Sequence, residues 1–279
     1  MSRLACPACG GRLARAGPVF RCEKGHSYDV AAEGYVYLLP PNKKHSRSPG
    51  DDKQMIASRR RFLEGGWYEP FSDALDRLCA ECLAGSGETP VVLDAGCGEG
   101  WYTGRLIRFL EGSGLSPEGY GFDISKSAVK AAAKKYRHIS FAVGSMFGIP
   151  FCPGEADLVT DVFAPIVPEE FLRVLKPGGH LVLAVPGARH LYGMKRILYD
   201  EPYENETRDT EYPGFTFLRR VPVRGTIETD DPRVMRDLFA MTPYYWKTPK
   251  EGCARLERAP SLGTETAFDF LIYRKAAKL

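Results

Sequence analysis

VVLDAGCGEG, residues 91–100, is an apolar run followed by an aspartate and three glycines at every second position. The apolar run predicts a buried strand, and the residues that follow predict a helix. A tight glycine turn at a helix N-terminus lets the backbone approach a ligand closely. Asp94, where the strand ends, can hold an ammonium group or organise the loop. The segment therefore predicts a strand, a ligand-binding loop and a helix in direct succession.

Strand and helix patterns alternate from residue 90 onward. Helical patterns at 102–110 and 127–136 separate apolar runs, which occur at 91–93, 120–122, 141–143, 158–162 and 181–185. Such alternation predicts an α/β fold with a parallel sheet covered on both faces. Further along, two strand-like segments, 216–224 and 266–274, flank a helical pattern near 232–240. These two strands are expected to close the sheet as an antiparallel pair.

A second acidic residue stands at the end of the next predicted strand. Asp123 follows Asp94 by 29 residues, so it can accept both hydroxyls of a ribose while Ile124 flanks an adenine. The glycine spacing differs from the G-x-G-x-x-G of dinucleotide-binding proteins, which disfavours a nicotinamide-dependent oxidoreductase. The ordered set resembles the signature of class I S-adenosylmethionine-dependent methyltransferases, as does LKPGG at 175–179. The resemblance implies a Rossmann-like, mostly parallel seven-stranded sheet whose last strand is antiparallel.

Four potential zinc ligands lie near the N-terminus, in the pattern Cys6-x2-Cys9-x12-Cys22-x3-His26. Three thiolates and one imidazole provide the tetrahedral ligand set that zinc prefers. So short a region buries little apolar surface, and a metal would supply the missing stability. The alternative is three unconnected cysteines and a surface histidine. Cys79-x2-Cys82 lies in a predicted helix without a second ligand pair, so its thiols are expected to be buried and structural.

The sequence predicts three regions: a zinc-binding β module at 1–40, a basic linker with helices at 41–85, and a methyltransferase domain at 86–279. Residues 1–70 contain 12 Lys or Arg and 7 Asp or Glu, whereas the whole chain has a net charge of only +3. A basic N-terminal region favours binding of a polyanionic partner. The alternative is that these charges only lie on a solvent-exposed face. No secretory signal and no apolar run of about 18 residues is apparent, which favours the cytoplasm and no membrane.

Nearly the whole chain is similar to the 23S rRNA (guanine-N1)-methyltransferases of the RlmA type. Beyond the zinc ligands, the similarity is carried by EGYV at 33–36, SPGD at 48–51, RRRFL at 59–63, GWY at 66–68, GARHL at 187–191 and MTPYYW at 241–246. The resemblance implies methylation of guanine N1 in a hairpin of 23S rRNA, with S-adenosylmethionine and zinc as cofactors. The family's two branches choose neighbouring guanines, and residues 46–51 are more similar to the branch typified by Gram-negative bacteria.

Several cofactor contacts are implied by this resemblance alone. The family's contacts fall on Tyr68, on Gly98 with Glu99, and on His190. Without the resemblance, Tyr68 would be interpreted as a core aromatic and His190 as a loop histidine with a local hydrogen bond. The complete expected cofactor set is Tyr68, Asp94, Gly96, Gly98, Glu99, Gly100, Asp123, Ile124 and His190.

RNA contacts are expected in residues 42–61, which hold seven Lys or Arg and two acids. Lys and Arg bind phosphates without reading sequence. The expected residues are Lys43, Lys44, Arg47, Arg59, Arg60 and Arg61. Three consecutive arginines on a helix cannot all face one surface, so at least one of them is expected to pair with an acid. The candidates for stacking on the target base are Phe163, Tyr244, Tyr245 and Trp246, each of which could equally belong to the core.

The proton of guanine N1 needs an acceptor, and Asp161 stands where the fourth strand ends. The alternative is a strand-end acid that caps a loop. Two other kinds of function stay open: a catalytically inactive RNA-binding zinc protein, and a methyltransferase of another RNA or of a small molecule. A homodimer is also left open. Because the zinc module is expected to lie outside the sheet, loss of its metal should reduce RNA-dependent activity more than cofactor affinity.

Overall fold

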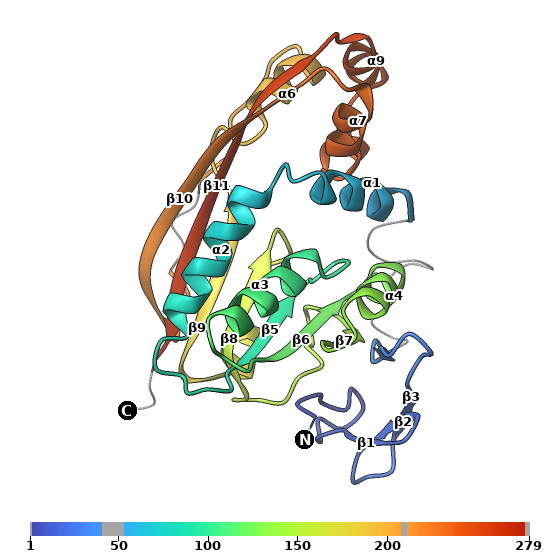
Figure 1. The fold of residues 1–279 in the computed structure, drawn as a ribbon, viewed down its shortest axis with the longest axis vertical. Coiled ribbons are helices and arrows are strands. Elements are labelled where there is room, and N and C mark those ends of the chain that lie inside the picture. The colour runs from blue at the N-terminus through green and yellow to red at the C-terminus, as the bar shows by residue number, and fades with distance from the viewer. Residues whose placement is uncertain (1, 41–52, 208–210, 277–279) are drawn as a thin grey trace.

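The computed structural model describes residues 2–40, 53–207 and 211–276. Its centre is an eight-stranded sheet with the order β10-β11-β9-β8-β5-β6-β7-β4 (Figure 1). β11 runs antiparallel to both of its neighbours, and the other strands pair in parallel. The strands are β4 (Val36–Tyr37), β5 (Val91–Ala95), β6 (Glu118–Asp123), β7 (Ser140–Val143), β8 (Ala156–Val162), β9 (Leu175–Pro186), β10 (Phe215–Thr229) and β11 (Leu262–Lys275). The class I methyltransferase fold, with its reversed last strand, is confirmed, but the sheet has eight strands instead of the expected seven because β4 is added to it.

The two faces of the sheet are covered differently. Val92 points into one core and its neighbours Val91 and Leu93 into the other, because side chains alternate along a strand. The first core, which contains Val92, is covered by most of the helices. The second core, which contains Val91 and Leu93, is covered by the zinc module and α5. The helices are α1 (Lys53–Glu64), α2 (Glu69–Cys82), α3 (Trp101–Gly112), α4 (Lys126–Lys135), α5 (Pro168–Val174), α6 (Tyr192–Leu198), α7 (Pro232–Ala240), α8 (Tyr244–Lys247) and α9 (Lys250–Arg258).

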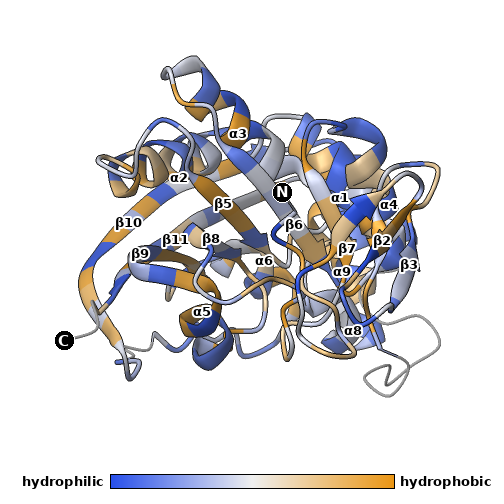
Figure 2. Ribbon diagram, turned by 90° about the horizontal axis from the view of Figure 1, so that it is seen from below, coloured by the Kyte–Doolittle hydropathy of each residue, from blue (hydrophilic) through white to orange (hydrophobic). Residues whose placement is uncertain are grey.

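β5 is buried along its whole length and appears largely in the orange of apolar residues in Figure 2. Its neighbours β6 and β8 place the loops that follow them beside the glycine loop. Within the described ranges, no helix is both long enough and apolar enough to cross a membrane.

The N-terminal module contributes to the main sheet. Its three short strands form a separate antiparallel sheet, but β4 then pairs in parallel with β7 as the eighth strand. Leu13 and Phe20 belong to the same hydrophobic core as Leu93 and Phe151. The expectation that the module lies outside the sheet is therefore wrong. The three module strands are β1 (Ala14–Ala16), β2 (Val19–Arg21) and β3 (Ser27–Asp29).

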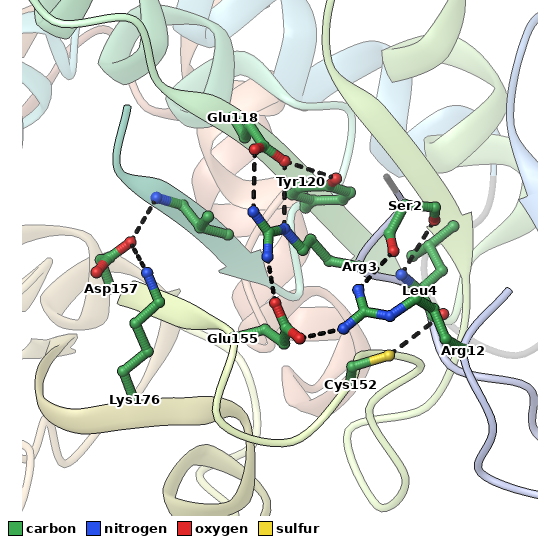
Figure 3. A network of polar contacts seen from close by, with 11 residues as sticks. Ser2, Arg3, Leu4, Arg12, Glu118, Tyr120, Cys152, Glu155, Asp157 and Lys176 are labelled. Carbon is green, nitrogen blue, oxygen red and sulfur yellow. Dashed lines mark hydrogen bonds and ion pairs between the residues drawn. The ribbon is translucent and has the colours of Figure 1, made fainter. Parts of the chain in front are cut away.

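A polar network fastens the module to the amino ends of the strands (Figure 3). The guanidinium of Arg3 lies 3.1 Å from the carboxylate of Glu118, where β6 begins, and it also contacts Glu155. Arg12 pairs with the same Glu155. The Arg3 guanidinium lowers the pKa of Glu118, so this carboxylate stays ionised. Charges at strand ends therefore fix the orientation of the module.

Backbone hydrogen bonds join the module to the segment that leads into β8. The Ala5 N–H donates to the carbonyl of Pro150 at 3.2 Å. The Cys152 N–H donates to the carbonyl of Arg3 at 2.8 Å, and Leu4 bridges to Phe151. The N-terminal strap therefore supports the far end of the connection between β7 and β8.

Candidate active site and zinc centre

The glycine loop follows β5 and ends where α3 begins. Gly96, Gly98 and Gly100 have φ values of 78°, 55° and 75°, in the left-handed region that favours glycine. A Cβ built on Gly96 would lie 2.4 Å from the Cβ of Ala164, in the loop after β8. A Cβ on Gly100 would lie 3.1 Å from Phe141. The two loops therefore approach each other as closely as the backbone allows.

Asp94 is buried at the end of β5 and organises this loop. Its carboxylate accepts hydrogen bonds from the hydroxyl of Thr103 on α3 and, at 3.0 Å, from that of Thr160 on β8. Burial raises the pKa of Asp94 to about 6, against the opposing effect of these two bonds. Sequence reasoning missed both threonines, although Thr160 interrupts an apolar strand. Of the two roles considered for Asp94, the structure shows loop organisation.

Asp123 joins the glycine loop to the turn after β6. One carboxylate oxygen accepts from the Gly98 N–H at 3.0 Å and the other from the Ser125 N–H at 2.7 Å. Ser125 in turn caps α4 by accepting from the Ala128 N–H at 3.3 Å. Ile124 lies between them, half-buried against the first core. Asp123 and Ile124 are therefore held at the mouth of the glycine loop.

Tyr68 and His190, far apart in the chain, lie together in an aromatic cluster. Their ring centroids are 6.4 Å apart, and both rings contact Phe268, at 5.0 and 4.5 Å. Phe163 stacks on His190 with centroids 6.4 Å apart and an interplanar angle of 19°. Because Ala164 meets Gly96, this cluster borders the glycine loop. The structure thus brings the two distant predicted contacts to one site.

Both side chains are neutral hydrogen-bond donors. The Nδ1 atom of His190 accepts from the Ala267 N–H at 3.3 Å, which assigns the proton to Nε2. Burial, with a smaller effect of Lys195, lowers the pKa of His190 to about 3. Burial raises the pKa of Tyr68, so its hydroxyl stays protonated. Each of the two side chains therefore keeps one proton that it can donate, on Nε2 of His190 and on the hydroxyl of Tyr68.

Asp161 is the last residue but one of β8 and lies opposite Ala95 of β5. Its Oδ1 accepts from the Ala164 N–H at 2.9 Å, whereas the buried Oδ2 has no hydrogen-bond partner among the described residues. Burial raises the pKa of Asp161 to about 7, opposed by the Ala164 bond and reinforced by Asp94. Phe163, two residues after Asp161 and just beyond the end of β8, has a φ of 60°, which is strained for a residue with a side chain. An unsatisfied carboxylate and backbone strain thus occur together beside the glycine loop.

Glu99 is buried on the loop itself. Its Oε2 accepts from the Arg60 Nε at 2.6 Å, and its Oε1 has no partner in the part of the chain that the structure describes. Burial raises the pKa of Glu99, although Arg60 opposes this. Arg61 forms two hydrogen bonds to Asp237 on α7, at 2.8 and 2.6 Å. The expectation that at least one of the three arginines pairs with an acid is therefore confirmed.

α1 lies between the glycine loop, α7 and α4 (Figure 1). The remaining arginine of the three, Arg59, donates to the carbonyl of Met241 at 3.3 Å. Its Nη1 also lies 3.9 Å from the position of a Cβ on Gly98. Lys43, Lys44 and Arg47 lie outside the described residues.

The predicted stacking residues differ in exposure. Phe163 is 44% exposed at the site, and Trp246 is 66% exposed. Tyr244 and Tyr245 are half-buried against the first core. Phe163 and Trp246 therefore present more ring surface than the two tyrosines.

The ligand atoms of Cys6, Cys9, Cys22 and His26 all lie within 4.8 Å of one another. The Cys9 and Cys22 sulfurs are 3.7 Å apart, and the Nδ1 of His26 is 3.6 Å from the Cys6 sulfur and 3.3 Å from the Cys22 sulfur. Tetrahedral zinc with Zn–S bonds of about 2.3 Å separates two sulfurs by about 3.8 Å. The residues fit zinc, and four protein ligands make the site structural.

The immediate surroundings support the zinc ligands. The Gly10 N–H donates to the Cys6 carbonyl at 2.8 Å and closes the first ligand turn, and the Gly25 N–H does the same for Cys22 at 2.9 Å. The hydroxyl of Tyr28 lies 3.3 Å from the Cys6 sulfur. Hydrogen bonds of this kind orient metal ligands.

Two family models match the chain. One is described as "RlmA, N-terminal" zinc ribbon and covers residues 4–47, and the other is a methyltransferase domain that covers residues 92–179. The second match implies S-adenosylmethionine as the cofactor of this domain.

Three relatives extend the similarity beyond the two models. The chain is 32% identical to the 23S rRNA (guanine(748)-N(1))-methyltransferase of Streptomyces fradiae, over 93% of this chain and 91% of the relative. It is 31% identical, over 98% of both chains, to a Bacillus subtilis (strain 168) protein provisionally named a 23S rRNA (guanine-N(1)-)-methyltransferase. A Micromonospora griseorubida protein with a similar provisional name is 37% identical over 68% of both chains. The chain therefore belongs to the RlmA-type 23S rRNA (guanine-N1)-methyltransferase family, within the class I S-adenosylmethionine-dependent methyltransferases, and it has that family's N-terminal zinc ribbon.

Proposed function

We propose that this protein transfers a methyl group from S-adenosylmethionine to N1 of a guanine in a hairpin of 23S rRNA. The observation that carries the proposal is the unpartnered, buried Oδ2 of Asp161 beside the glycine loop, because methylation at guanine N1 requires a proton acceptor. The names of the full-length relatives supply the substrate. We also propose that the protein is located in the cytoplasm. Whether it is a monomer or a homodimer can be measured by light scattering.

The cofactor site follows from the donors and acceptors already described. In the proposal, the backbone of Gly96, Gly98 and Gly100 lines the cofactor, Asp123 accepts from its ribose hydroxyls, and Ile124 flanks its adenine. Tyr68 and His190 donate to its carboxylate. Glu99 offers Oε1 to a donor of the cofactor, because only its Oε2 is paired with Arg60.

The cofactor, once bound, supplies a methyl group on a positively charged sulfur. Transfer of this methyl group to guanine N1 would form a carbon–nitrogen bond while the carbon–sulfur bond breaks, and would leave a neutral thioether. The N1 proton passes to Asp161. Most of the acceleration comes from holding the two reactants at attack distance and excluding water. The target base must leave its stack, which costs least in a hairpin loop, and Phe163 and Trp246 are the proposed stacking partners.

The Asp161→Asn variant is expected to lower the single-turnover methylation rate by about 10²- to 10⁴-fold, the usual contribution of a general base. A base acts in its ionised form, and burial raises the pKa of Asp161 to about 7. The wild-type rate should therefore rise with pH up to about 7 and then level off, whereas the variant loses this rise. Rapid-quench measurements at saturating cofactor test both expectations. A wild-type pH rise that survives in the variant would assign the proton to another group.

The Asp123→Ala variant is expected to weaken S-adenosylmethionine binding by about 1.5–3 kcal/mol, as for hydrogen bonds to a charged group. It loses the two backbone hydrogen bonds that join the glycine loop to α4, as well as the proposed ribose contact. Titration calorimetry measures the change. An Asp157→Ala variant, whose carboxylate pairs with Lys176 at the amino end of β8, is the control that should keep its affinity. Equal affinities for wild type and Asp123→Ala would contradict this placement.

Mass mapping of 23S rRNA tests the proposed substrate. Ribosomal RNA from a deletion strain should lack one methyl group on one guanine, and restoring the gene should restore that methyl group. An unchanged methylation map would favour another RNA, a small molecule or a catalytically inactive RNA-binding protein. The same map identifies the guanine: residues 46–51 favour the branch typified by Gram-negative bacteria, whereas the Streptomyces fradiae relative is named for guanine 748.

A further inference from the structure

One face of α4 is strongly basic. Residues 124–139 contain five Lys or Arg and no Asp or Glu. The apolar side chains of α4, including Val129 and Ala132, are buried against the sheet, whereas Lys126, Lys130 and Lys134 are exposed. Residues four apart lie on the same side of a helix, so these three lysines form one stripe.

Acids of the protein neutralise this stripe only in part. Lys130 pairs with Glu33 of the zinc module at 2.9 Å, and Lys135 pairs with Glu64 of α1 at 2.7 Å. For Lys126, Lys134 and Arg137, the structure shows no carboxylate within ion-pair distance among the residues it describes. Three exposed cations are therefore available to a partner.

Helix stability explains only some of these charges. Lysines in the last turn, such as Lys134 and Lys135, are favourable because the C-terminus of a helix carries partial negative charge. Lys126 is the first residue of α4, where the helix dipole disfavours a cation, and the first turn contains no acid. The charge at Lys126 thus works against the helix, which points to a role outside it.

The position of α4 connects the zinc module to the mouth of the cofactor site. The helix begins three residues after Asp123, and its last turn reaches α1 through Lys135 and Glu64. α1 in turn contacts the glycine loop through Arg60 and Glu99. Figure 1 shows α4 between α1 and the strands of the module. A chain lying along α4 would therefore lead to the reaction site.

We propose that the exposed face of α4, formed by Lys126, Lys130 and Lys134, binds the phosphate backbone of the substrate RNA together with Arg137, which lies just beyond the end of the helix. This inference rests on the proposed function. Regularly spaced cations, of which only Lys130 forms an ion pair among the described residues, match a polyanion with repeating charge, and they position it without reading its sequence. An acidic protein partner would instead leave RNA binding unchanged when the stripe is removed.

The test compares two double variants. Lys126→Ala with Lys134→Ala removes two charges from the stripe, and alanine preserves the helix. Arg77→Ala with Arg108→Ala is the matched control, because both arginines are exposed on α2 and α3 and, in the described part of the chain, show no ion pair. Binding of the isolated rRNA hairpin is measured as a function of salt, together with methylation of the same hairpin and calorimetry with S-adenosylmethionine.

For the stripe variant, the slope of log affinity against log salt should fall by about 1.4–1.8, and affinity at 0.15 M salt by about 15- to 30-fold. The methylated base and the cofactor affinity should stay the same, and the control should match wild type. If the wild type methylates the hairpin but the stripe variant has an unchanged salt slope, α4 does not bind the RNA. The proposed function would still stand in that case. Absence of wild-type methylation overturns the function itself. A control that loses as much as the stripe variant shows that the charge effect is not local to α4 and also overturns the proposal.

Discussion

The Cys9→Ser variant is expected to lose zinc, to unfold at a temperature lower by about 10 °C or more, and to bind S-adenosylmethionine more weakly. Structural zinc contributes about 10–16 kcal/mol in isolated zinc-finger peptides, so losing even part of this exceeds most single substitutions. A loss of about 5 kcal/mol would lower the melting temperature by about 10–20 °C in a domain of this size.

The expected loss of cofactor affinity follows from how the module is attached. Cys6 and Cys22 belong to the same hydrophobic core as the second face of the sheet. Ala5 hydrogen-bonds to Pro150 in the connection between β7 and β8, and that connection includes Met146. The Cε of Met146 lies 3.8 Å from the position of a Cβ on Gly96. Disorder in the module would therefore reach the cofactor loop through this connection.

Metal analysis, thermal unfolding, calorimetry and hydrogen exchange of residues 144–152 together test this prediction. A Cys253→Ser variant is the control, because Cys253 lies on α9, far from the zinc ligands in the chain, and its thiol donates to the carbonyl of Thr248. A zinc-free protein that keeps full cofactor affinity and normal exchange at 144–152 would show that the module and the cofactor site are independent.

Local patterns predicted the central part of the fold. The apolar run before Asp94 forms β5, and the glycines form a turn because all three adopt positive φ values. The ligand spacing of Cys6, Cys9, Cys22 and His26 predicted a cluster that the structure confirms. In each case the sequence pattern and the structure that it predicts lie within about 25 residues of one another. Over this range the local preferences of turn and strand residues dominate.

Contacts between distant segments could not be predicted in this way. β4 has only two residues, too few for a periodic signal, yet it becomes the eighth strand because β7 has an open edge. The pairing of Arg60 with Glu99 depends on how α1 crosses the glycine loop. Tyr68 and His190 meet only through tertiary packing, so the family resemblance was the only source for that pair. The lysines of α4 were visible in the sequence, but their significance needed the position of the helix.

The Gly96→Ala variant is expected to bind S-adenosylmethionine at least about 30-fold more weakly. At a φ of 78° a side chain costs about 1–2 kcal/mol, and the new Cβ would lie 2.4 Å from that of Ala164, so a further 1–3 kcal/mol of repacking is needed.

The Gly98→Ala variant separates the cost of backbone strain from the cost of the steric clash. Gly98 also has a positive φ, of 55°, but the atom nearest to its new Cβ, on Arg59, lies 3.9 Å away. Gly112→Ala, at the end of α3 with no atom within 4 Å, is the neutral control. Calorimetry should rank the loss of affinity as Gly96, then Gly98, then Gly112. A Gly96→Ala protein that folds and binds the cofactor like wild type would contradict the close approach of the two loops, since that approach leaves no room for a methyl group.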